Sequence, residues 1–251
     1  MKKRIRKLIP LLLALSALSS CAASHFVDPI STPVFTAPLQ GEVQGNIDAH
    51  DKISIQGACS LPMDFAIDVS RENWSHGLSN DQEGTSVAAG HFWPIDNSSI
   101  LVLGGFGFGS HRLSNLSGYS SMNASQKLSY TGNNDFRDYF LQLSYSHTLS
   151  NAPLRCDIGV ASRFIYLDQY NFYQSELEWT VESNSNVNSD SSLSIYTNPR
   201  QSTQLDFAGF FTVGIEHIQL YLQLLVQLPL ASYTDDPVDV LMASCGLKVA
   251  F

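Results

Sequence analysis

Apolar and polar residues alternate along most of this chain, most clearly near its C-terminal end. Between residues 218 and 230 every second residue is aliphatic, and Gln219, Gln223 and Gln227 lie among the residues between them. The last segment, 241–251, repeats the alternation and ends on Phe251. A period of two sends successive side chains to opposite sides of a strand. Both segments therefore predict strands with one apolar face and one different face.

The same alternation recurs in eight earlier segments, of which the one at 84–93 is the weakest. The ten predicted strands are 39–47, 53–61, 63–70, 84–93, 100–108, 139–149, 156–166, 205–215, 218–230 and 241–251. Long amphipathic helical patterns are absent from the sequence. We expect an all-β fold, a single antiparallel up-and-down β-barrel of about 10 strands (8–10), whose last strand pairs with its first.

The connections between these strands sort by length. Short ones lie at Pro62, 94–97, 150–153 and 216–217, and long ones at about 73–83, 113–132 and 171–201. Alternate connections of an up-and-down barrel lie on the same side, and transmembrane barrels combine short periplasmic turns with longer outer loops. The sequence therefore predicts long loops on one side of the barrel and short turns on the side of both termini.

The N-terminus has the pattern of a targeting segment. Basic residues at 2–7 precede an apolar run, 8–17, that is too short to span a bilayer as a helix, and Leu18-Ser19-Ser20-Cys21 follows. This order resembles the lipobox of bacterial lipoproteins. The resemblance implies a signal peptide over 1–20, an acyl anchor such as palmitate on Cys21 and sorting to the outer membrane. We expect a flexible tether over 21–36 and a barrel domain over 37–251.

The C-terminus carries a second resemblance. A polar residue, Ser244, is followed two positions later by Gly246 and then by the hydrophobic residues Val249 and Phe251. This spacing resembles the signal that the outer-membrane barrel-assembly machinery reads. With the lipobox, it makes the chain similar to a Gram-negative outer-membrane β-barrel lipoprotein. The resemblance implies membrane lipid and the assembly machinery as partners.

Charge and residue types exclude some functions. Without residues 1–20 the chain keeps 9 basic and 23 acidic residues, a net charge of −14, which argues against nucleic acid as a partner.

Cys59, Cys156 and Cys245 occupy strand positions, so we interpret them as small apolar side chains of the wall. The spacings CxxC and HxxxH do not occur, and we expect neither a metal nor a cofactor. The glycine-rich run 104–109 has no helix after it and predicts a membrane strand, not a phosphate site.

Charged residues on the less apolar face predict the filling of the lumen. A barrel of ten strands is narrow, so its inward side chains pack against one another, and buried charges among them need partners. Arg163 and Asp206 lie on neighbouring predicted strands with inward parity. We expect them to form an ion pair, with Asp157 or Asp138 nearby, as part of a hydrogen-bonded plug.

Function is expected outside the membrane, because loops held by a rigid scaffold usually carry it. The longest predicted loop offers Tyr170, Phe172, Tyr173 and Trp179 as contacts for an extracellular partner. We expect a monomer without catalysis. Two alternatives remain open at this point: a lipocalin-like barrel that binds a small hydrophobic ligand, and an outer-membrane enzyme that modifies lipids. Full insertion into the membrane and attachment by the lipid alone are also both open.

Overall fold

The computed structural model describes residues 30–48, 52–76, 80–121, 124–150, 154–182, 190–196, 200–215, 217–232 and 241–251. Its elements are β1 (Gly41–Asp48), β2 (Ile53–Ser60), the 3-10 turn η1 (Pro62–Asp64), β3 (Phe65–His76), β4 (Asn80–Ile95), β5 (Ser98–Ser121), β6 (Ala124–Ser150), β7 (Arg155–Glu182), β8 (Asp190–Tyr196), β9 (Arg200–Gly214), β10 (Ile218–Ser232) and β11 (Leu241–Ala250). Within these ranges no helix has the length and apolar character needed to cross a membrane.

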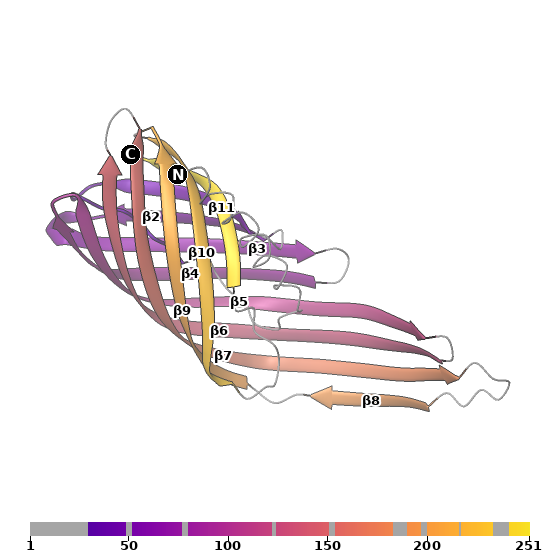
Figure 1. Cartoon of the computed structure of the whole chain (residues 1–251). Coiled ribbons are helices and arrows are strands. Elements are labelled where there is room, and N and C mark those ends of the chain that lie inside the picture. The colour runs from indigo at the N-terminus through magenta and orange to yellow at the C-terminus, as the bar shows by residue number, and fades with distance from the viewer. Residues whose placement is uncertain are drawn as a thin grey trace.

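Ten of these strands form a closed antiparallel ring, which confirms the predicted all-β barrel (Figure 1). Chain neighbours pair in turn, β7 pairs with β9, and β6 also pairs with β7. The ring closes between β1 and β11, where Val43 lies opposite Val249. At the end of this seam Gly41 and Phe251 exchange two backbone hydrogen bonds of 2.8 Å. The predicted pairing of the last strand with the first is therefore present.

The connections lie on the predicted sides, but all three predicted long loops are largely strand. Residues 113–132 continue β5 and β6, and much of 171–201 continues β7 and adds β8, which within the described ranges pairs with β7 alone. The predicted loop at 73–83 likewise holds the ends of β3 and β4. These segments are rich in Ser, Asn and Gln and lack a continuous apolar face, so periodicity missed them. Backbone pairing continues there because it does not require one apolar face.

The end of the barrel where β1 begins, β11 ends and the short turns lie is called here the short-turn end, and the other is the extended end. At the extended end β5, β6, β7 and β8 project beyond the other strands (Figure 1). We call the part formed by 114–121, 124–131, 175–182 and 190–196 the outer sheet. A bulge between Asn133 and Asp135, facing Tyr173 and Tyr170, lies where β7 passes from the barrel wall into this sheet.

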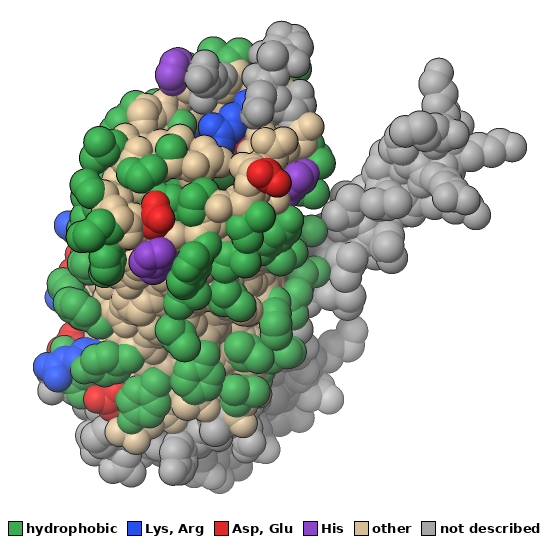
Figure 2. Space-filling view, turned by 90° about the vertical axis from the view of Figure 1, so that its left-hand side faces the viewer, with side chains coloured by type: hydrophobic (Ala, Val, Ile, Leu, Met, Phe, Trp, Pro, Cys, Tyr) green, Lys and Arg blue, Asp and Glu red, His purple; other side chains and the backbone are tan. Residues whose placement is uncertain are grey.

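Side chains of the wall alternate between a polar lumen and an apolar outer face. Among the described residues 34 large hydrophobic side chains are exposed, nearly all of them on the outer face (Figure 2). On β10, for example, Leu220, Leu222 and Leu224 point outward, while Gln219 and Gln223 are buried in the lumen. A soluble monomer rarely exposes an apolar patch of more than a few hundred Å². Lipid contact around the barrel explains this surface.

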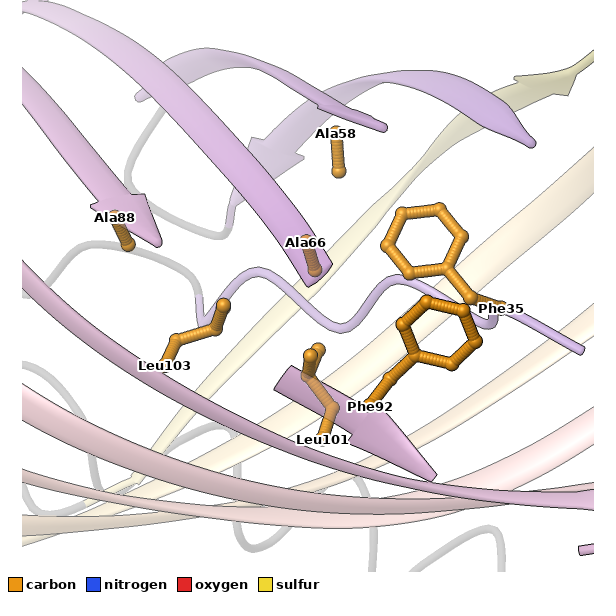
Figure 3. Packing of buried hydrophobic residues seen from close by; sticks show 7 residues of the cluster. All are labelled: Phe35, Ala58, Ala66, Ala88, Phe92, Leu101 and Leu103. Carbon is orange, nitrogen blue, oxygen red and sulfur yellow. The ribbon is translucent and has the colours of Figure 1, made fainter. Parts of the chain in front are cut away.

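The prediction of a flexible tether over 21–36 is wrong for its described part. Ile30, Thr32, Val34 and Phe35 are each at most 6% exposed, because this stretch lies inside the barrel. Phe35 packs in the lumen against Phe92 and Leu101 (Figure 3). A run of Ser, Thr and Pro without periodicity resembles a linker, but its apolar residues fill space that the wall side chains leave open. Residues 21–29 lie outside the described part of the chain.

Candidate functional site in the barrel lumen

Polar side chains from almost every barrel strand line the lumen. Those buried to at least nine-tenths include Glu42, Gln44, Asn46, Lys52, Gln56, Asp68, Glu72, Gln142, Asp157, Arg163, Asp206, Gln219, Gln223, Gln227 and Lys248. The predicted lumen glutamines of β10 are thus in place. Burial of a polar side chain is unfavourable unless the side chain is hydrogen-bonded, so the partners of these residues determine what the lumen does.

Two ion pairs join neighbouring strands near the seam. Lys248 of β11 lies 2.6 Å from Glu42 of β1, with side-chain exposures of 2% and 8%. Lys52 pairs with Glu72 of β3, which also accepts a hydrogen bond of 2.7 Å from Gln82 of β4. The charged residues that the sequence predicts in the lumen do not include these two lysines. The alternation places each lysine on the inward face, but it does not indicate the carboxylate with which the lysine pairs.

The predicted ion pair between Arg163 and Asp206 is present. The residues face each other in the register of β7 and β9, and Arg163 Nη2 lies 3.2 Å from Asp206 Oδ2. Gln204 and Gln227 each donate to Asp206 Oδ1 over 3.2 Å, and the Arg163 guanidinium carbon lies 5.6 Å from the Phe140 ring centroid.

Of the two carboxylates expected near Arg163, only Asp138 shares its surroundings. Asp138, Phe140, Arg163 and Gln204 are among the residues that line a small cavity of about 20 Å³, which has room for about one water molecule. Asp157 instead accepts hydrogen bonds from Thr148, Arg155 and Thr212 near the short-turn end of β7.

A segment of the chain itself occupies the lumen, and we call Ile30–Thr36 the lumen segment. Wall side chains bind its backbone: Gln223 donates to the Ile30 carbonyl oxygen over 2.9 Å, and Gln142 donates to the Ser31 carbonyl oxygen. The backbone N–H of Val34 donates to Glu42 over 3.3 Å. The wall thus recognises the segment partly through its backbone.

Two hydroxyl groups of the lumen segment also bind the wall. Ser31 Oγ donates a hydrogen bond to the Asp68 carboxylate of β3. Thr32 Oγ1 lies 3.1 Å from the hydroxyl of Tyr221, a residue that is 1% exposed. These contacts reach opposite parts of the ring, since β3 and β10 are separated by β2, β1 and β11. The segment therefore bridges the lumen.

Apolar side chains anchor the lumen segment at two heights. Phe35 packs in a cluster of Ala58, Ala66, Ala88, Phe92, Leu101 and Leu103, and its ring centroid lies 5.6 Å from that of Phe92 (Figure 3). Several of these residues lie near the short-turn ends of their strands. Ile30 packs on Ala161, Ala208 and Leu225, each six or seven positions away from that end. The segment therefore rises from the short-turn mouth into the middle of the barrel.

Glycines on β5 make room for bulky inward side chains. A Cβ added at Gly105 would overlap the Phe140 ring, and one at Gly107 would meet the Asp138 carboxylate, whereas nothing lies near Gly104, which faces outward. The glycine-rich run is therefore part of a wall strand, as predicted. The three cysteines Cys59, Cys156 and Cys245 are free and have outward parity.

The predicted contact residues all lie on β7, not in a loop. Tyr170 has outward parity beside the bulge, and the Arg137 guanidinium carbon lies 4.5 Å from its ring centroid. Nearby on the outer face Arg71 and Glu83 approach to 3.8 Å, so charged groups border the apolar surface at the extended end. Phe172, Tyr173 and Trp179 have described backbones in β7, and their side chains lie outside the described residues.

The predicted assembly signal forms the closing strand, where Gly246 faces Asn46 across the seam and Ser244 faces Gln223. A Cβ at Gly246 would overlap the Gly45 carbonyl oxygen, so glycine is required there by packing as well. Val249 and Phe251 are exposed on the outer face and at the short-turn end. The lipidation residue, Cys21, lies outside the described residues.

A serine and a histidine meet on the outer face. Ser98 Oγ lies 2.8 Å from His147 Nδ1 and 3.1 Å from the hydroxyl of Tyr145. Among the described residues no carboxylate is hydrogen-bonded to His147, so the pair lacks the third group that orients a catalytic imidazole. No group of three or more His, Cys, Asp and Glu side chains with the arrangement of a metal site occurs in the described ranges.

The polarity of the inward and outward faces distinguishes a membrane-spanning barrel from a soluble ligand-binding barrel. A wall with polar side chains inside and an apolar band outside is the arrangement of barrels that cross a membrane. The chain is an outer-membrane-type β-barrel. A barrel that carries an apolar ligand in water has the opposite arrangement.

Similarity to known proteins is low. No family model and no curated protein matches the chain. Among solved structures, a KdgM porin in complex with disordered oligogalacturonate is 10% identical, over 85% of this chain and 99% of that one, with a TM-score of 0.37. The translocator domain of the autotransporter NalP from Neisseria meningitidis is 11% identical, over 99% and 95%, with a TM-score of 0.21. An OmpT loop-deletion mutant from Vibrio cholerae is 8% identical, over 85% and 98%, with a TM-score of 0.19.

Proposed function

We propose that this chain is a lipid-anchored outer-membrane protein without catalytic activity, which spans the membrane as a barrel and binds an extracellular partner through its outer sheet. The observation that carries the proposal is the length of three strands. A membrane-spanning strand needs about 9–11 residues, but β5, β6 and β7 have 24, 27 and 28 residues. Crossing the bilayer does not require the additional residues.

The orientation follows from the two ends. Short turns lie on the periplasmic side of outer-membrane barrels and longer excursions lie outside. With that orientation the short-turn end faces the periplasm, and the outer sheet extends from the cell. Residues 173–182 of β7, at about 3.4 Å each, reach about 34 Å beyond the bulge. The outer sheet therefore extends well beyond the lipid bilayer.

Backbone geometry makes the outer sheet suitable for binding. Within the described residues its two border strands have unpaired edges, since 114–121 of β5 pairs only with β6 and β8 pairs only with β7. Unpaired edges accept an additional strand from a partner. Tyr170, Phe172, Tyr173 and Trp179 remain the proposed side-chain contacts on β7.

Shortening the outer sheet in register tests the proposal. One variant replaces 115–130 with Asn-Gly, which leaves Ser114 opposite Thr131, and a second replaces 176–194 with Asn-Gly, which leaves Ser175 opposite Ile195. A control replaces 77–79 with the same turn. Intact cells carrying each variant are compared on arrays of glycans and immobilised extracellular proteins. We expect equal amounts of folded barrel and loss of binding only with a shortened sheet. Binding that is unchanged by both replacements contradicts the proposal.

The lipid anchor is tested separately. We expect a Cys21→Ser variant to lose its acyl label. The lipid-modifying alternative has one observation in its favour, the hydrogen bond between Ser98 and His147. A fluorophosphonate probe labels an activated serine, so labelling that Ser98→Ala abolishes would favour the enzyme over the binding protein.

A further inference from the structure

The structure assigns a second activity to the barrel: we propose that the lumen segment is a displaceable plug, and that the lumen it vacates conducts small cations. This inference goes beyond the proposed function, because it concerns the lumen and not the outer sheet. Its test is independent of whether the sheet binds a partner.

The wall of the barrel is complete without the lumen segment. All ten strands of the ring pair with wall strands, and Ile30–Thr36 supplies no strand to that ladder. Among the described residues, the segment is held only by side-chain packing and by hydrogen bonds to individual wall side chains. Its departure therefore leaves the hydrogen-bonded ring intact.

The vacated lumen is polar enough to fill with water. The wall groups that form hydrogen bonds with the segment are amide, hydroxyl and carboxylate groups, from Gln142, Gln223, Tyr221, Glu42 and Asp68. Water replaces the lost hydrogen bonds of such groups at little cost. A lumen wide enough for a peptide backbone with its side chains then has room for water and hydrated ions.

Charge favours cations over anions in this path. The ion pairs Lys248–Glu42, Lys52–Glu72 and Arg163–Asp206 join wall residues to each other and persist without the segment. The segment itself carries no charged residue. Among the described residues Asp68 has no basic side chain within ion-pair distance, and Ser31 of the segment is its hydrogen-bond partner. Departure of the segment therefore exposes a negative charge to the lumen.

Conductance in planar lipid bilayers tests the inference with the full acylated chain in KCl at pH 8. The test variants lack Ile30–Thr36 or carry Ile30→Ser with Phe35→Ser, which removes the anchors but keeps the chain length. Leu39→Ser is the matched control, because Leu39 is an apolar residue just outside the segment and is 76% exposed. Folding is verified for each protein by circular dichroism and by the shift in gel migration on heating.

We expect the full chain and Leu39→Ser to have low conductance, and the two test variants to conduct at least about ten times more, with K⁺ preferred over Cl⁻ in a salt gradient. Adding Asp68→Asn to the deletion is expected to lower the K⁺/Cl⁻ permeability ratio several-fold. A folded test variant that conducts no better than the full chain overturns the plug. Failure of both test variants to fold overturns its displaceability, and an unchanged permeability ratio overturns the role of Asp68.

Discussion

Removal of Arg163 gives the most direct test of the lumen network. Its partner Asp206 is fully buried and, within the described part of the chain, keeps only the hydrogen bonds from Gln204 and Gln227, each 3.2 Å long. Breaking a buried ion pair by removing one partner costs about 3–5 kcal/mol, since the remaining charge stays buried. Arg163 and Gln204 line a cavity with room for about one water molecule, and truncation of Arg163 to alanine opens further space for water beside Asp206. We therefore expect Arg163→Ala to lower the free energy of unfolding by about 3 kcal/mol, the low end of that range.

The assay is guanidinium unfolding in lipid vesicles, followed by tryptophan fluorescence. With a slope of about 4 kcal/mol per M, the loss moves the midpoint down by about 0.75 M. The double variant Arg163→Met with Asp206→Leu removes both charges and is expected to recover most of the stability, because no unpaired charge remains. An Arg163→Ala midpoint equal to that of the parent, or a double variant less stable than Arg163→Ala, would refute the reasoning.

Three further predictions concern the wall and its anchoring. Gly246→Ala is expected to reduce the yield of heat-modifiable barrel severely, because its Cβ overlaps the facing backbone, while Gly45→Ala, with open space around it, assembles normally; equal yields would contradict the packing role. Gly105→Val is expected to lower the free energy of unfolding by about 1–3 kcal/mol, because the new side chain clashes with Phe140. Gly104→Val, at the lipid face, is expected to change it by less than about 0.5 kcal/mol. Denaturant midpoints measure both changes. Cys21→Ser is expected to remain in the membrane pellet after carbonate and high-salt washes, because the apolar band holds the barrel without lipid; release of this variant would exclude a membrane-spanning barrel.

Sequence alone determined the wall of this barrel. Strict alternation on β10 and β11 identified which face meets lipid, since a period of two fixes the face of every side chain once one of them is known. It also predicted the seam, where β11 meets β1, and the ion pair between Arg163 and Asp206, since both follow from parity and neighbouring strands.

The tertiary structure decided what periodicity does not encode. The outer sheet is held by backbone pairing, which leaves no apolar pattern in Ser- and Asn-rich strands such as 114–121. Lys248 lies next to Glu42 only because the first strand, β1, pairs with the last strand, β11, at the seam. The lumen segment shows the reason most clearly: Ile30 and Phe35 lack a periodic signal, and their burial depends on a cavity that exists only once ten strands have closed around it.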